Sequence, residues 1–323
     1  MTTIGIVAIG RNEGARLLAC LASLAREKAP VVYVDSGSTD GSVAAAERAG
    51  ADVVLLDLKV PFTAARARNA GLARLRAIAP EAEFVQFIDG DCELREGWIS
   101  AACAHLGSNP DVAVVCGRRR ERHPEASVYN RFLDAEWDTP VGDAAACGGD
   151  ALMRISAIAP LGGYRNTLIA GEEPELCLRL REAGWRIVRL DAEMTLHDAA
   201  ITKFSQWWRR AKRAGHAYAE VCLIHRASAH RIWMRETVRA LLWSALLPAT
   251  ILAGIARPLF LLLLLAFPAQ FLRLLWRARG RGGDAPAFAA LTLAAKFAEA
   301  AGVANYAASR LFRRPPQLIE YKT

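Results

Sequence analysis

The chain has 323 residues, which is enough for one large domain or for one domain with an appendage. Hydrophobic residues make up 53% of it, and 41 Lys and Arg against 33 Asp and Glu give a net charge of +8. A basic balance suits nucleic acid, anionic lipid or a phosphorylated substrate. Because the sequence has no zinc-finger spacing and no RNP-like aromatic motif, we exclude nucleic acid as a partner and assign the charge to membrane and phosphate.

The cysteines and the first residues bear on the compartment. There are seven cysteines, an odd number, and no Cys-x-x-Cys occurs, which favours buried reduced thiols in a cytosolic compartment. Residues Met1–Ile4 run straight into an apolar pattern without a basic segment or a cleavage site. We therefore do not expect a signal peptide.

Short apolar runs alternate with helical spacing over the first ninety residues. The apolar runs are Ile4–Ile9, Val31–Val34, Val53–Leu56 and Phe84–Ile88, and the helical stretches between them are Glu13–Glu27, Gly41–Gly50 and Phe62–Ala79. This alternation predicts an α/β fold with a mostly parallel, doubly wound sheet. Polar residues such as Arg11, Asp35 and Asp89 follow the strands' carboxyl ends, where open α/β sheets bind ligands.

The pattern is less regular between residues 98 and 235. We expect helices at Trp98–Leu106 and Leu176–Ala183, strands at Val112–Cys116, Ala151–Ser156 and Ile187–Leu190, a loop-like region over 117–150, and a basic, aromatic helical stretch over 203–235. His197 follows the last of these strands in a segment that we expect to be a polar loop.

The tail is of a different kind. Residues 240–256 and 258–272 are almost purely apolar, and Arg257-Pro258 separates them. Arginines flank both ends, which favours a helical hairpin that enters the membrane from the cytoplasm and returns. Each run is shorter than the ~20 residues of a typical span, so full crossing stays open, and a buried helical subdomain is the alternative. We therefore expect a catalytic domain over 1–235 and a hydrophobic, membrane-associated region over 236–323.

The strongest local motif is Asp89-Gly90-Asp91, directly after the apolar run that ends at Ile88. Two carboxylates two residues apart form a pincer for a hard divalent cation such as Mn²⁺ or Mg²⁺. Such a cation would neutralise a diphosphate leaving group. The alternative is a solvated acidic turn.

Two further motifs suit a nucleotide. Asp35 ends an apolar run and can accept the imide N–H of uracil, whereas the residues after it, Ser38 and Asp40, also suit a helix N-cap. Arg66 and Arg68 lie on a predicted helix. One of them reaching a diphosphate is the functional interpretation, and a solvated basic face is the alternative.

In order and spacing, these motifs resemble those of the family 2 glycosyltransferases of GT-A fold. The resemblance runs from Ile4 to about Arg213. It also includes Val7–Glu13 and the acidic segment Gly171–Leu180. It implies a GT-A catalytic domain that uses a nucleotide sugar and a divalent metal.

The resemblance also implies roles for individual residues. Asp35 would bind the nucleobase, and Asp91 would ligate the metal. Glu173 inherits the place of the general base, with Glu172 as the other candidate, because the family usually has Glu-Asp where this chain has Glu172-Glu173. The further donor-binding candidates are Ile9, Arg11, Glu13, Arg66, Arg68, Asp89 and Gly90.

Three later features complete the expected site. His197 resembles a late histidine that adds a metal ligand in some GT-A enzymes, although a lone histidine is also a common structural residue. Asp150, after two glycines, suits a donor-sugar or acceptor loop, or a turn cap. The segment Gln206–Arg210 resembles part of the Gln-x-x-Arg-Trp motif of processive synthases without its last Trp, so we do not expect processivity. Trp207, Trp208 and Arg210 remain candidates for stacking on a sugar or acceptor, or for an interface anchor.

Together these expectations describe an inverting, metal-dependent glycosyltransferase at the inner membrane, with its catalytic domain in the cytoplasm. A UDP-sugar is the favoured donor, and a lipid-linked or envelope-polysaccharide acceptor is the favoured partner. The alternatives are a nucleotidyltransferase, whose glycine-rich loop the segment Gly10–Gly14 does not match, and a catalytically inactive nucleotide-binding membrane scaffold.

Overall fold

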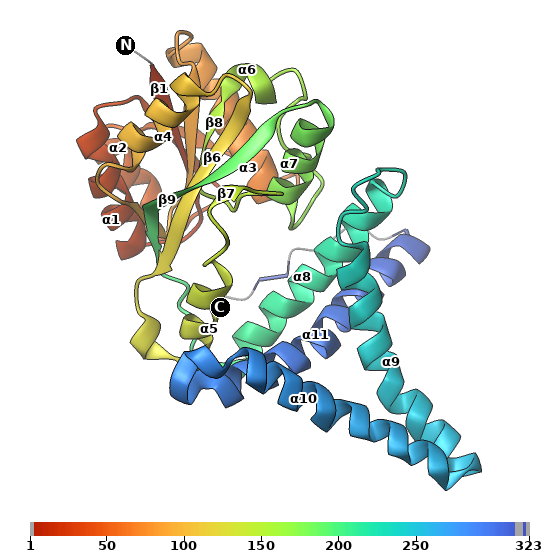
Figure 1. Ribbon diagram of the computed structural model, residues 1–323. Coiled ribbons are helices and arrows are strands. Elements are labelled where there is room, and N and C mark those ends of the chain that lie inside the picture. Colours follow the sequence, from red (N-terminus) through yellow and green to blue (C-terminus); the bar gives the residue numbers. More distant parts are fainter. Residues whose placement is uncertain (1–2, 314–318, 321–323) are drawn as a thin grey trace. The chain divides into compact units, whose positions relative to one another are not determined.

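The computed structural model describes residues 3–313 and 319–320 (Figure 1). The chain divides into two compact units. The first unit is Met1–Pro124 with Leu133–Ala200, and the second is Glu125–Phe132 with Ile201–Thr323. The expected boundary between residues 235 and 236 thus lies inside the second unit. The reason is that helix α8 (Phe204–Ile224) packs along helix α11 (Ala285–Leu311) and so belongs with the tail.

The described strands of the first unit form one mixed sheet in the order β3-β2-β1-β4-β8-β6-β9-β5, with β7 paired to β9. Strands β1 to β4 are mutually parallel where they pair, and β8 is antiparallel to both β4 and β6. The strands are β1 (Ile4–Gly10), β2 (Val31–Asp35), β3 (Asp52–Leu55), β4 (Phe84–Asp89), β5 (Cys92–Leu94), β6 (Val112–Glu121), β7 (Gly142–Asp143), β8 (Ala151–Arg154) and β9 (Arg186–His197).

Helices cover this sheet and bury its apolar strands. They are α1 (Ala15–Leu24), α2 (Ser42–Arg48), α3 (Ala64–Ile78), α4 (Trp98–Ser108), α6 (Ile155–Ile158) and α7 (Glu172–Glu182). Helix α3 approaches β1 closely, because a Cβ on Gly71 would lie 2.3 Å from a methyl group of Val7. That approach brings Arg68, one turn earlier on α3, to the edge of the sheet.

Four elements differ from the expectations. Strand β6 continues to Glu121, through arginines that we expected to lie in a loop, and helix α5 (Val128–Glu136) lies in the same expected loop. Strand β9 runs on to His197, so this histidine ends a strand that pairs with β5 and does not lie in a polar loop. Helix α7 begins at Glu172 rather than Leu176, because Gly171 adopts a left-handed conformation (φ 81°) that starts the helix early.

The second unit is helical. After α8 come α9 (Met234–Ala256), the 3₁₀ segment η3 (Pro258–Leu265), α10 (Ala266–Arg277), the 3₁₀ segment η4 (Arg279–Asp284) and α11. In the described residues, three segments are long and apolar enough to cross a membrane. They are Met234–Ala256, Pro258–Arg277 and Arg279–Leu311, with mean hydropathies of 1.7, 2.0 and 1.4.

Candidate active site

The carboxyl ends of β1, β2 and β4 meet at one edge of the sheet. In the pairing register, Gly10 of β1 lies opposite Asp35 of β2, and Ile9 lies opposite Asp89 of β4. The backbone N–H of Gly90 donates to the Ile9 carbonyl oxygen (2.7 Å). The sheet therefore gathers the acidic motif and Asp35 around the first loop, as parallel strands with a common carboxyl edge do.

Asp35 is buried and held by its own loop. One carboxylate oxygen accepts the backbone N–H groups of Gly37 (2.8 Å) and Ser38 (2.7 Å), and the other accepts the Tyr33 hydroxyl (3.2 Å). The loop after β1 is bonded to this loop, because the Asn12 side chain accepts the N–H of Thr39 (2.7 Å). Asp35 is thus fixed in position at the end of β2.

Arg68 joins three carboxylates. It is 2% exposed, and its Nη2 donates to Asp89 Oδ1 (2.7 Å). Its Nη1 donates to Glu172 Oε1 (2.9 Å) and lies 3.1 Å from Glu173 Oε1. This arginine therefore ties the acidic motif after β4 to the first turn of α7. A buried guanidinium requires opposite charge around it, which these three ion pairs supply. A contact between Arg68 and a phosphate stays a prediction.

A second arginine, Arg119, holds the other side of Asp89. Its Nε and Nη2 reach Asp150 Oδ2 (3.0 and 2.8 Å), and its Nη2 also lies 3.2 Å from Asp89 Oδ2. Asp150 is fully buried, and it also accepts the Asp89 N–H (3.1 Å) and the Thr195 hydroxyl (2.6 Å). The structure therefore brings Asp150 to the acidic motif, as a buried support rather than as a turn cap.

Arg119 was not among the site residues expected from the sequence. The register between β6 and β9 shifts on either side of Arg118, and such bulges redirect side chains near sites. The Arg-rich run from Arg118 to Arg120 was the available signal, but it gave no indication of which arginine turns inward.

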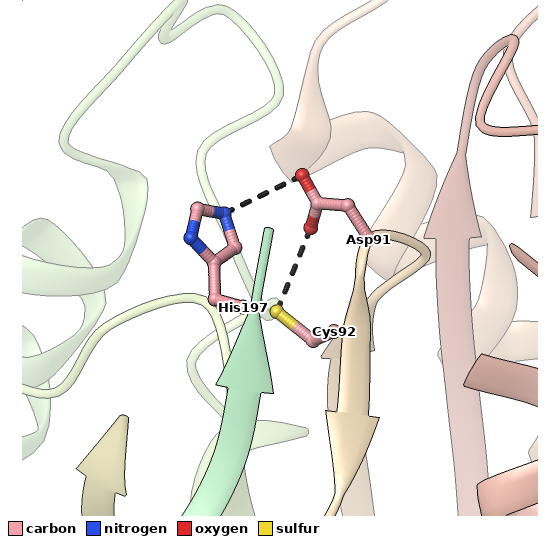
Figure 2. A group of neighbouring side chains, drawn as sticks. All are labelled: Asp91, Cys92 and His197. Atoms are coloured by element: carbon pink, nitrogen blue, oxygen red, sulfur yellow. Dashed lines mark hydrogen bonds and ion pairs between the residues drawn. The ribbon is translucent and has the colours of Figure 1, made fainter. Parts of the chain in front are cut away.

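Asp91 lies beside His197 and Cys92 (Figure 2). His197 Nε2 is 3.4 Å from Asp91 Oδ2, and the Cys92 thiol donates to Asp91 Oδ1 (3.5 Å). Strand pairing brings these residues together, because Cys92 of β5 lies opposite His197 of β9. The ring of Trp137 packs edge-on against the imidazole, with 4.8 Å between ring centroids.

The electrostatic surroundings set the protonation of these groups. Burial, together with the positive charge of Arg119, lowers the pKa of His197 to about 4, so the imidazole is neutral at pH 7. Burial raises the pKa of the Cys92 thiol well above its usual range, so the thiol keeps its proton and acts as a donor to Asp91. A carboxylate oxygen of Asp91 and a neutral imidazole nitrogen of His197 are therefore available as ligands for a cation.

This pair fits a divalent metal. Two ligands at about 2.1 Å from one ion, at right angles, lie about 3 Å apart, which is close to the 3.4 Å between Asp91 Oδ2 and His197 Nε2. Asp91, Cys92 and His197 form one of two clusters among the described residues that offer three metal-ligand atoms within 4.8 Å of one another. Asp89 suits a metal less well, because both of its oxygens already face arginines.

Glu172 and Glu173 lie in the first turn of α7 and differ in exposure. The side chain of Glu172 is 4% exposed and that of Glu173 is 15% exposed. Burial raises the pKa of Glu173 to about 7, the negative charge of Glu172 adds to the rise, and Arg68 opposes it. A carboxylate with a pKa near 7 suits general base catalysis at neutral pH.

The other donor-binding candidates have local partners. Arg66 donates to the backbone oxygens of Val60 (2.7 Å) and Asp57 (2.8 Å) and so braces the loop before α3. The Arg11 guanidinium lies over the Phe62 ring, 4.5 Å from its centroid, and Glu13 pairs with Arg16 (2.8 Å). The structure places these three around the first loop and the start of α3.

Of the two roles expected for Trp207, stacking on a sugar does not fit its position. It lies in the second unit and is 2% exposed, and its ring packs against Tyr129 and Phe204 with centroid distances of 6.4 and 5.4 Å. Burial between aromatic neighbours leaves no ring face for a sugar. Trp208 and Arg210 lie next to it on α8 and are half-buried.

The fold and the site together indicate the structural class of the protein. A mixed, mostly parallel sheet with flanking helices, and an acidic motif after its fourth strand, is the GT-A arrangement of glycosyltransferases. Residues 6–139 match the family model described as glycosyl transferase family 2. This part of the chain therefore resembles the family 2 glycosyltransferases.

Individual relatives agree with this class. Over 208 residues the chain is 30% identical to the pre-mycofactocin glycosyltransferase of Mycobacterium tuberculosis (strain CDC 1551 / Oshkosh). The match covers 60% of this chain and 43% of that protein, so the chain spans less than half the length of this relative.

Among solved structures, the mannosyltransferase PcManGT from Pyrobaculum calidifontis, in complex with GDP-Man and Mn²⁺, superposes with a TM-score of 0.61 at 18% identity. That superposition covers 96% of this chain and 87% of that one. Residues 1–349 of TarS from S. aureus superpose with a TM-score of 0.50 at 15% identity, over 69% and 65% of the two chains. Both likenesses concern the fold.

Proposed function

We propose that this protein transfers a sugar from a nucleotide-sugar donor to an acceptor hydroxyl, with a divalent cation held by Asp91 and His197. The observation that supports the proposal most strongly is the set of ion pairs that the buried Arg68 makes. It ties Asp89, of the motif that would hold the donor, to Glu172 and Glu173, the candidate bases. One buried arginine thus holds the donor-binding part of the site and the candidate bases next to each other. This arrangement suits a reaction in which the acceptor oxygen displaces the nucleoside diphosphate in one step.

The donor end consists of Asp35, the loop after β1 and the acidic motif. Asp35, fixed at the end of β2, is our candidate for the nucleobase, and a uracil imide suits a carboxylate acceptor. The bound cation, Mn²⁺ or Mg²⁺, would stabilise the charge that develops on the diphosphate. PcManGT was solved with GDP-Man and Mn²⁺, which supports this type of donor and metal; a UDP-sugar is our favoured donor here.

The base end is Glu173. Its carboxylate takes the proton of the acceptor hydroxyl as that oxygen bonds to the anomeric carbon. The bond from the anomeric carbon to the diphosphate breaks at the same time, and the nucleoside diphosphate leaves with the electron pair. Attack from the face opposite the leaving group inverts the configuration. Glu172, which is more buried and bonded to Arg68, acts through its charge, which raises the pKa of Glu173.

We also propose that the acceptor is membrane-proximal, either a lipid-linked sugar or an envelope polysaccharide. The three apolar segments of the second unit support membrane association. Arginines such as Arg235, Arg239 and Arg277 flank the first two segments, and the positive-inside rule then places the catalytic domain in the cytoplasm, at the inner membrane.

The direct test is a screen of nucleotide sugars with the full-length protein in membranes, with and without Mn²⁺. The proposal predicts metal-dependent release of a nucleoside diphosphate for at least one donor, and greater release with lipid-linked acceptors. Pyrophosphate release from a nucleoside triphosphate and a sugar phosphate would instead indicate a nucleotidyltransferase. Nucleotide binding without any cleavage would indicate an inactive scaffold.

A further inference from the structure

Helix α9 and the segment formed by η3 and α10 fold back on each other at Arg257. Near this turn a Cβ on Gly254 would lie 2.4 Å from the side chain of Leu261, so the two arms are in contact. Farther from the turn, Trp243 and Phe267 meet edge-on, with 5.5 Å between ring centroids. Close approach at a small residue is the packing that membrane helices use. The two arms therefore form an antiparallel hairpin.

Arginines lie at the base and at the tip of this hairpin, and the two arms between them are of equal length. The first arm, from Ala240 to Ala256, has about 17 helical residues, which at 1.5 Å each measure roughly 26 Å. The return arm has the 8 residues of η3, at about 2.0 Å each, and about seven α-helical residues to Leu272, which again gives roughly 26 Å. Arg239 and Arg273 bound the base of the hairpin, and Arg257 marks its tip.

The hairpin surface suits a bilayer. Arg257 is the one charged residue between Arg239 and Arg273, and large apolar side chains near the tip stand exposed, such as Ile255 (78%) and Leu259 (75%). Arms of roughly 26 Å come within a few ångströms of the hydrocarbon thickness, about 30 Å. Local thinning and the long side chain of an arginine absorb such a mismatch.

Helix α11, whose composition also qualifies as a span, packs most extensively on α8, and its Phe297 ring also stacks on Phe267 of the hairpin with 6.1 Å between ring centroids. A Cβ on Gly215 of α8 would lie 1.9 Å from the backbone of Glu299, and a Cβ on Gly302 would lie 2.0 Å from the backbone of Lys212. The two helices thus pack backbone to backbone. Helix α8 carries several basic residues, which are Arg209, Arg210, Lys212 and Arg213. It is therefore too polar to enter the hydrocarbon.

We infer that α9 and the η3–α10 segment each cross the bilayer once, with Arg257 at the opposite headgroups, whereas α11 stays on the side of α8. This topology rests on the membrane association proposed above, but it involves no donor or acceptor. Its failure would therefore leave the transferase proposal intact.

The test uses single-cysteine additions to the full-length protein in sealed vesicles with the catalytic domain outside. Ala256→Cys places a thiol beside the tip, Gly280→Cys places one at the base, and Ala308→Cys places one near the end of α11; all three positions are exposed. The native cysteines end at Cys222, so peptide mass spectrometry separates each new thiol from them. The reagent is a membrane-impermeant maleimide, applied before and after permeabilisation.

The inference predicts that Gly280→Cys and Ala308→Cys are labelled in intact vesicles, and that Ala256→Cys is labelled only after permeabilisation. Labelling of Ala256→Cys in intact vesicles would overturn the crossing and indicate a hairpin lying on one leaflet. Labelling of Ala308→Cys only after permeabilisation would overturn the placement of α11. Absence of label at Ala256→Cys under both conditions would show that the tip stops inside the hydrocarbon, which also contradicts the inference.

Discussion

The guanidinium of Arg68 lies 3.1 Å from the carboxylate of Glu173, and its other terminal nitrogen donates to Asp89 at 2.7 Å. One buried side chain thus sets the separation between the acidic motif and the candidate base. The same contact opposes the rise in the pKa of Glu173 that burial and Glu172 produce. Its consequences are measurable as changes in rate and in the dependence of rate on pH.

The first prediction concerns the pH dependence of transfer. Because the pKa of Glu173 is raised to about 7, the fraction of the enzyme with a deprotonated base grows as pH rises through 7. The value of kcat/KM should therefore increase from pH 5.5 to about pH 7 and then level off. Glu173→Gln should lower kcat by about 10²–10⁴-fold and abolish this rise. Glu173→Asp keeps a carboxylate and should retain part of the activity; a Glu173→Gln enzyme with the wild-type profile would exclude Glu173 as the base.

The second prediction concerns Arg119. Arg119→Gln removes the positive charge between Asp89 and Asp150 and leaves the buried Asp150 Oδ2 without its charged partner. We expect kcat/KM to fall by at least about tenfold, since a lost charged hydrogen bond of about 1.5–3 kcal/mol corresponds to that range. The matched control is Arg120→Gln, on the same strand but exposed and paired with Glu193, which should change kcat/KM little. Equal effects of the two variants would argue against a role for Arg119 in holding the acidic motif.

The third prediction concerns metal binding without donor. If Asp91 and His197 share the ion, His197→Gln should weaken Mn²⁺ binding, measured by the electron paramagnetic resonance signal of free Mn²⁺. Loss of one ligand should raise the Kd by about 10–100-fold, the range seen when groups around a metal site are altered. His216→Gln, in the second unit, serves as the control. Unchanged Mn²⁺ affinity in His197→Gln would show that the histidine is structural.

The fourth prediction separates structure from chemistry in α8. Trp207 is buried between Tyr129 and Phe204, so Trp207→Ala should destabilise the protein by about 3–5 kcal/mol, as a large-to-small core substitution does. Thermal unfolding in detergent measures this loss, and Trp208→Ala, at a half-buried position, should cost less. Normal stability of Trp207→Ala together with a raised KM for the acceptor would restore the stacking role.

The parts of the site that follow strands were predictable from the sequence. Asp35 and Asp89 end apolar runs, and parallel strands with a shared carboxyl edge bring such residues together. The sequence also predicted that Glu173 would lie near the acidic motif, through the family resemblance rather than through any local pattern.

Other features depend on long-range geometry that no local pattern records. The inward turn of Arg119 depends on register shifts in β6. The strand position of His197 depends on pairing with β5. This strand is short and follows β4 in the chain, but it lies at the edge of the sheet beside β9. The burial of Trp207 depends on Tyr129, from a segment about eighty residues earlier in the chain that folds with the second unit.

The measurement that tests the central claim most directly is donor cleavage by matched preparations of wild-type protein and Asp91→Asn across a range of Mn²⁺ concentrations. The nucleoside diphosphate released is quantified with the donor identified in the screen. We predict that the wild-type rate rises with Mn²⁺ and saturates, whereas Asp91→Asn shows a rate lower by at least about 10²-fold, because an electrostatic stabiliser of the leaving group is worth that much. Equal rates in the two proteins, or a wild-type rate independent of Mn²⁺ and of chelator, would contradict the account.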